Sequence, residues 1–108
     1  MLKGELYDIV SLTPETAQIR INPSSVVYAA HFPGFPITPG VVIVKIAVEL
    51  AGMVLNRKVD VVSAKNIKFL SPVIPDSDTT LLFKFPEQGS VSVYKGETLC
   101  ATMSIGLN

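Results

Sequence analysis

The chain has little of what disulfide, metal and redox sites are built from. Its 108 residues include one cysteine, one histidine and no tryptophan. The lone Cys100 excludes an internal disulfide, and one cysteine with one histidine cannot form a cysteine–histidine metal site. We expect Cys100 to be a small core residue in a protein of the reducing cytoplasm. The length corresponds to a single domain, residues 1–108, and excludes a separate cofactor domain.

An excess of charge of one sign and long hydrophobic runs are missing too. Nine basic residues balance nine acidic ones without forming a run, so nothing indicates binding to nucleic acid or to an anionic membrane. The apolar stretch at residues 41–55 is too short to span a membrane and is interrupted by Lys45 and Glu49. Residues 1–8 carry charges where a signal peptide needs its apolar region. A hydrophobic content of 48%, against 17% charged residues, exceeds what a small monomer needs and predicts oligomerisation.

The most constrained stretch is HFPGFPITPG at residues 31–40. Its three prolines and two glycines predict a rigid, non-repetitive loop, because proline fixes φ and glycine adopts conformations closed to other residues. The loop also carries the only histidine, His31, which can exchange protons near neutral pH. It is therefore our first candidate for chemistry. A proline-rich surface loop with an incidental histidine is the alternative.

Residues 41–55 predict one long helix directly after this loop. Thr38 can cap it, Pro39 suits its first position, and Gly52 with residues 56–57 suits its other end. Because this helix is apolar on nearly all faces, we expect a sheet wrapped around it. The predicted fold class is α+β, with an antiparallel β-sheet around one long central helix. The expected strands cover residues 4–12, 15–21, 61–70, 79–85, 90–94 and 98–105, and the last two form a hairpin at 95–96.

Two motifs resemble those of a known family. HFPGFPITPGV at 31–41 is similar to the signature of the 3-hydroxyacyl-ACP dehydratases of fatty-acid synthesis, which have the hotdog fold. IKFLSPVIPDSD at 67–78 resembles a second segment of that family, one that recurs broadly in hotdog proteins. Together with the order of the predicted elements, the resemblance covers nearly the whole chain.

The resemblance implies a lyase that needs no metal or redox cofactor. It would remove water from a 3-hydroxyacyl thioester, carried by acyl carrier protein or coenzyme A, in fatty-acid, polyketide or related acyl-chain synthesis. It also implies a homodimer, or a higher oligomer of dimers, whose sheets join edge to edge and whose active sites lie at the interface. By matching position, His31 of one protomer is the base for the α-proton and faces the helix of the other. Gly40 is the backbone donor to the thioester carbonyl.

The residues are suited to this chemistry. Removing a weakly acidic α-proton requires a positioned base and a group that stabilises the charge developing on the carbonyl oxygen. The free amide groups of Gly40 and Val41, aligned with the helix dipole, are suitable donors. We expect Phe32 or Phe35 to line the acyl channel or the dimer contact.

The chain departs from the family at one position. Fourteen residues after His31, where the family carries an acid that acts at the 3-hydroxyl, the sequence has Lys45. Glu49, about one helical turn further on, could replace that acid if the substrate bound differently. Alternatively, Lys45 itself protonates the departing hydroxyl or holds a water. In a third interpretation the two residues form an ion pair, and the protein binds acyl chains without converting them.

Two other functions compete with dehydration. Hotdog domains also hydrolyse acyl thioesters with an acid on this helix, so Glu49 could serve an acyl thioesterase. A non-catalytic acyl-binding subunit that pairs with an active homologue is the other alternative, and Lys45 favours it.

Overall fold

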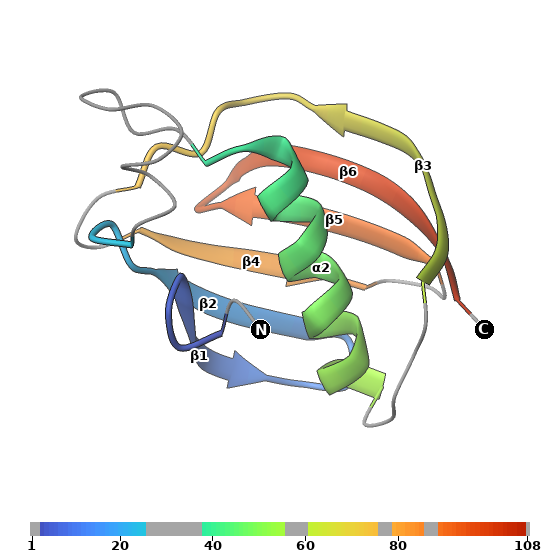
Figure 1. Ribbon diagram of the computed structural model, residues 1–108, viewed down its shortest axis with the longest axis horizontal. Coiled ribbons are helices and arrows are strands. Elements are labelled where there is room, and N and C mark those ends of the chain that lie inside the picture. Colours follow the sequence, from blue (N-terminus) through green and yellow to red (C-terminus); the bar gives the residue numbers. More distant parts are fainter. Residues whose placement is uncertain (1–2, 26–37, 56–60, 76–78, 86–88, 108) are drawn as a thin grey trace.

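A computed structural model describes residues 3–25, 38–55, 61–75, 79–85 and 89–107 (Figure 1). The elements in this part of the chain are β1 Tyr7–Leu12, β2 Thr16–Ile21, α2 Gly40–Leu55, β3 Val61–Phe69, β4 Thr80–Lys84, β5 Ser90–Lys95 and β6 Thr98–Leu107. Every expected strand and the expected helix are present. Their ends differ from the predicted ones by at most three residues.

The strands form one antiparallel sheet in the order β1-β2-β4-β5-β6-β3. α2 lies across one face of this sheet, which curves around the helix, and β1 and β3 are the two edges (Figure 1). The α+β arrangement predicted from the sequence is therefore confirmed. The hairpin between β5 and β6 turns at Gly96 and Glu97, one residue later than predicted, because Lys95 still pairs with Thr98. Gly96 has a φ of 62°, a conformation that favours glycine.

The core lies between α2 and the concave face of the sheet. Alternation along the strands turns every second residue toward it, as in β2, where Ala17, Ile19 and Ile21 are buried and their neighbours are not. Cys100 on β6 is also buried, which confirms it as a small core residue. The helix contributes one buried stripe, formed by Val42, Ile43, Ile46, Ala47, Leu50 and Ala51.

The start of α2 is fixed by Pro39. The carbonyl of Pro39 accepts hydrogen bonds from the N–H groups of Val42 (3.0 Å) and Ile43 (3.2 Å), which closes the first helical turn. Gly52 lies within the helix rather than past its end, since α2 continues to Leu55. Met53 and Val54, which follow Gly52, pack against the core, and this packing outweighs the cost of the single glycine.

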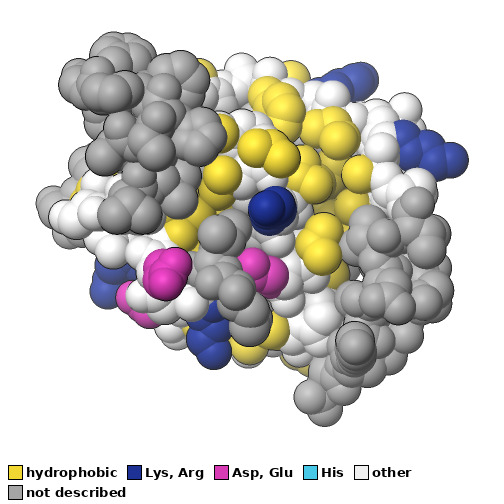
Figure 2. All heavy atoms as spheres, viewed as in Figure 1, with side chains coloured by type: hydrophobic (Ala, Val, Ile, Leu, Met, Phe, Trp, Pro, Cys, Tyr) yellow, Lys and Arg dark blue, Asp and Glu magenta, His cyan; other side chains and the backbone are white. Residues whose placement is uncertain are grey.

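The face of α2 that points away from the sheet is not covered by the described part of the chain. Val41 is 62% exposed and Lys45 is also exposed. Figure 2 looks onto this face and shows hydrophobic side chains gathered over the helix and the strands beside it. The expectation that the helix is surrounded is thus met on one side only, because a single curved sheet covers only the stripe that faces it. Among the described residues, no helix combines the length and the apolarity that crossing a membrane requires.

Candidate functional site

The candidate site begins where the proline-rich loop enters α2. His31, Phe32 and Phe35 lie outside the described residues, so their predicted roles stay predictions. The described part of the site starts at Thr38, whose N–H donates to the carbonyl of Val73 at 2.9 Å. This bond holds the entrance of the helix against the segment that follows β3.

Gly40 and Val41 are the first two residues of α2. The first N–H groups of any helix have no carbonyl one turn earlier to bind, and the dipoles of the following peptides make this end electropositive. The helix start can therefore donate hydrogen bonds to an oxygen that gains negative charge, as the sequence predicts for these two residues.

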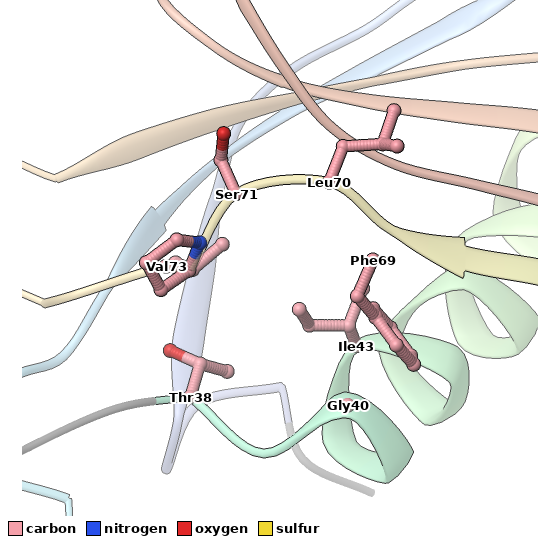
Figure 3. A pocket seen from close by; sticks show the side chains of 8 residues that line it. Thr38, Gly40, Ile43, Phe69, Leu70, Ser71 and Val73 are labelled. Carbon is pink, nitrogen blue, oxygen red and sulfur yellow. The ribbon is translucent and has the colours of Figure 1, made fainter.

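A pocket of about 380 Å³ opens at this helix start (Figure 3). Two segments far apart in the sequence form it, the entrance of α2 and the end of β3 with the residues after it. Leu70 and Ser71 are held in place because their N–H groups donate to the carbonyl of Cys100 on β6, at 2.8 and 3.3 Å. The pocket is largely apolar, and its lining residues are Thr38, Gly40, Ile43, Phe69, Leu70, Ser71, Pro72 and Val73.

The ring of Phe69 lies directly against Gly40. A Cβ atom added to Gly40 would be 2.6 Å from Cζ and 2.7 Å from Cε2 of this ring, closer than real Cβ contacts. Figure 3 shows the ring and the side chain of Ile43 side by side at the helix start. The space that a side chain at residue 40 would fill is thus taken by Phe69, which explains glycine at the first position of the helix.

Lys45 and Glu49 have different surroundings although they lie one turn apart on α2. Lys45 is exposed on the uncovered face of the helix. Oε1 of Glu49, by contrast, accepts hydrogen bonds from the hydroxyl of Tyr7 at 2.9 Å and from the N–H of Lys3 at 3.3 Å. These contacts direct the carboxylate of Glu49 toward β1 and the residues before it.

Tyr7 is completely buried, and its pKa is raised well above the usual tyrosine value. Burial is the main cause, because it disfavours the phenolate, and the hydrogen bond to Glu49 and that residue's negative charge act in the same direction. The phenol therefore stays protonated and serves as a permanent donor to Glu49.

Sequence analysis missed two features of this region, the hydrogen bond from Tyr7 to Glu49 and the contact of Phe69 with Gly40. No local sequence pattern links Tyr7 to an acid 42 residues away. Phe69 belongs to the second motif, IKFLSPVIPDSD, so a signal for it was present. In the described part of the chain, no three His, Cys, Asp or Glu residues lie close enough together to hold a metal ion.

Comparisons with known proteins agree with these observations. The model of a family described as ApeI-like, ApeI dehydratase, matches residues 12–104. A curated relative, the 3-hydroxyacyl-[acyl-carrier-protein] dehydratase FabZ of Solibacter usitatus (strain Ellin6076), is 36% identical over 56 residues. That match includes 44% of this chain and spans only about a third (35%) of the relative's length.

Solved structures show the same fold over nearly the whole chain. The dehydratase heterocomplex ApeI:P from Xenorhabdus doucetiae contains a chain that matches with a TM-score of 0.72 at 19% identity, covering 97% of this chain and 98% of that one. An uncharacterized protein from Erwinia carotovora subsp. atroseptica matches with a TM-score of 0.66 at 23% identity, over 95% and 94% of the two chains. An uncharacterized protein from Pyrococcus horikoshii gives 0.65 at 16% identity, over 95% and 82%. The fold is the hotdog fold predicted from the resemblance.

Proposed function

Because this chain belongs to the ApeI-like dehydratase family of hotdog proteins, we propose that it removes water from a 3-hydroxyacyl thioester carried by acyl carrier protein. The observation that carries the proposal is the apolar pocket at the N-terminal end of α2, beside Gly40. An acyl thioester needs both parts of this arrangement, an apolar wall for its chain and hydrogen-bond donors for its carbonyl oxygen.

The proposed reaction divides the work between three groups. The N–H groups of Gly40 and Val41 bind the thioester carbonyl and stabilise the negative charge that develops on its oxygen. His31 takes the proton from C2 of the substrate. The electron pair of that C–H bond forms the C2–C3 double bond, the C3–O bond breaks, and the departing hydroxyl receives a proton and leaves as water.

We propose that Lys45 delivers the proton to the departing hydroxyl. Glu49 is a poor candidate because its carboxylate accepts hydrogen bonds from Tyr7 and Lys3, on the side of the helix toward β1. Lys45 occupies the position of the family's acid and is exposed on the uncovered face of α2. An ammonium group is a proton donor, so the elimination stays balanced when the acid is replaced by lysine.

A second subunit completes the site in this proposal. The uncovered face of α2 and the end of β3 together expose large apolar side chains, with Val41 at 62%, Phe69 at 52% and Leu70 at 55%. β3 is also an edge strand that pairs only with β6 in the sheet. Such an apolar surface beside an open edge is typical of a protein interface. The second protomer would bring its His31 loop to Lys45 of the first.

The test is a dehydration assay with 3-hydroxyacyl-carrier-protein substrates of several chain lengths. We expect the 2-enoyl product from the wild-type protein, and a loss of about 100-fold or more in kcat for His31→Ala, the magnitude of a lost general base. No product at any chain length, or full activity of His31→Ala, would refute the proposal.

A non-catalytic subunit is the second candidate, favoured by Lys45 at the position of the family's acid. The ApeI:P structure is a heterocomplex by its description, so a pairing of this chain with an active homologue is a reasonable form for that role. Lys45→Glu separates the two candidates. If this variant dehydrates 3-hydroxyacyl chains and the wild-type protein does not, the chain is a partner subunit that has lost activity at this position.

A further inference from the structure

We infer that Phe69 determines which acyl groups reach the start of α2, by excluding substrates with a branch at C2. The inference rests on the proposed function, because it takes Gly40 to bind the carbonyl of an acyl thioester. It concerns the space beside that carbonyl, which the contact between Gly40 and Phe69 defines.

The first step is the position of the ring. Phe69 is the last residue of β3, and its ring fills the space that a Cβ atom of Gly40 would need, with Cζ only 2.6 Å from that point. The three heavy atoms nearest to that point all belong to this ring, and the third, Cε1, is 3.2 Å away. Phe69 therefore forms the part of the pocket wall that lies nearest to the first residue of the helix.

The second step is what a bound acyl group would place there. A carbonyl oxygen that accepts a hydrogen bond from Gly40 brings its own carbon and the attached C2 within a few ångströms of that residue. C2 thus lies beside the Phe69 ring, whereas the rest of the chain extends along the apolar lining of the pocket. In this position a methyl group on C2 would meet the ring, whereas two hydrogens would take up less of the space beside it.

The third step is the rigidity of the wall. The next two residues, Leu70 and Ser71, are fixed by their hydrogen bonds to Cys100 on β6. Ile43 lies beside the ring on the helix side (Figure 3). Phe69 is 52% exposed, so one side of it is open, whereas the other side of its ring lies against Gly40 at the start of the helix. A methyl group on C2 therefore meets packed atoms rather than a mobile side chain.

The experiment measures binding separately from turnover. The probes are S-butanoyl-pantetheine and S-(2-methylbutanoyl)-pantetheine, which lack the 3-hydroxyl and cannot be dehydrated. We expect the wild-type protein to bind the unbranched probe about 10-fold or more tightly than the branched one. This ratio of affinities is the lower end of what one methyl group contributes in an apolar pocket. Phe69→Ala should reduce this ratio to about threefold or less, and Phe69→Leu should give an intermediate ratio.

Ile67→Ala is the matched control. Ile67 lies on the same strand, is also exposed and does not line the pocket, so its truncation should leave the wild-type ratio unchanged. Circular dichroism and thermal unfolding establish that each variant is folded. If Phe69→Ala fails to fold, the ratio for Phe69→Leu decides the question.

The outcomes distinguish this inference from the proposed function. A wild-type ratio near one, the same ratio in wild type and in the folded Phe69 variants, or no binding of either probe would overturn the role of Phe69. A ratio that depends on Phe69, without enoyl product from the corresponding 3-hydroxyacyl substrates, would support the wall and refute only the dehydratase activity. Dehydration of branched and unbranched substrates at equal rates would support the dehydratase activity and refute the role of Phe69.

Discussion

The hydroxyl of Tyr7 donates a 2.9 Å hydrogen bond to Oε1 of Glu49, which joins β1 to the middle of α2. Tyr7 is fully buried, and the N–H of Lys3 donates to the same carboxylate oxygen. The pair explains why an acid stands on a helix that is otherwise almost entirely apolar. It also gives Glu49 a structural role, which supports the proposal that Lys45 rather than Glu49 delivers the proton.

Replacing Tyr7 by phenylalanine should destabilise the protein. The substitution keeps the ring in the core but removes the donor to a partly buried carboxylate, a loss of about 1 to 3 kcal/mol in the free energy of unfolding. Urea denaturation measures this change. Tyr94→Phe is the control, because the ring that lies under the ammonium of Lys84 is retained and no buried pair is broken. Equal stabilities of the two variants would show that the bond to Glu49 contributes nothing.

The same pair predicts a loss of stability at alkaline pH. The pKa of Tyr7 is higher in the folded protein than the unfolded value of about 10, so the protonated phenol stabilises the fold fully below that pH. As the pH rises above 10, the unfolded chain releases this proton first, and the free energy of unfolding falls by up to about 1.4 kcal/mol per pH unit. Unfolding curves from pH 8 to 11 should show a smaller slope for Tyr7→Phe than for the wild type. Parallel curves would contradict the assignment.

The sequence predicted the fold well because its signals are local. Pro39 directly precedes α2, alternation along residues such as Ala17, Ile19 and Ile21 shows which strand face is buried, and the motif at 31–41 indicated the family. The bond between Tyr7 and Glu49 could not be predicted, because it joins residues 42 positions apart and depends on how the helix is rotated on the sheet. Sequence spacing placed Glu49 on the same helix face as Lys45, whereas contacts with the N-terminal residues decide where its carboxylate points.

The contact between Gly40 and Phe69 was hidden for a similar reason. Each residue lies in a motif of its own, and nothing in either motif shows that the two meet. Their contact arises when the segment after β3 is fixed to β6 by the carbonyl of Cys100. The exposed face of α2 departs from the expectation that a sheet surrounds the helix, because a single curved sheet covers only one side of it.

Gly40 and Phe69 should show strong energetic coupling. Gly40→Ala adds a methyl group where the Phe69 ring lies, so in the wild-type background it forces the ring to move. In the Phe69→Ala background the same substitution meets no ring, so this clash is absent. We expect Gly40→Ala to be at least about 1 kcal/mol more favourable in that background, as measured by a double-mutant cycle of unfolding free energies. Additive effects would show that the ring does not restrict residue 40.

Lys45 and Glu49 should differ sharply in their effect on catalysis. Lys45→Met keeps an unbranched chain of similar length and removes the proton donor, so kcat for dehydration should fall about 100-fold or more. Because Lys45 is exposed, the free energy of unfolding should stay near the wild-type value. Glu49→Gln keeps an oxygen that can accept the hydrogen bond from Tyr7, so kcat should change by less than about threefold. Because the uncharged oxygen is a weaker acceptor, the free energy of unfolding should fall by about 1 kcal/mol. Steady-state kinetics and urea denaturation on the same preparations give both quantities. A large loss of kcat in Glu49→Gln, with Lys45→Met fully active, would transfer the acid role to Glu49 and require a substrate position about one helical turn further along α2.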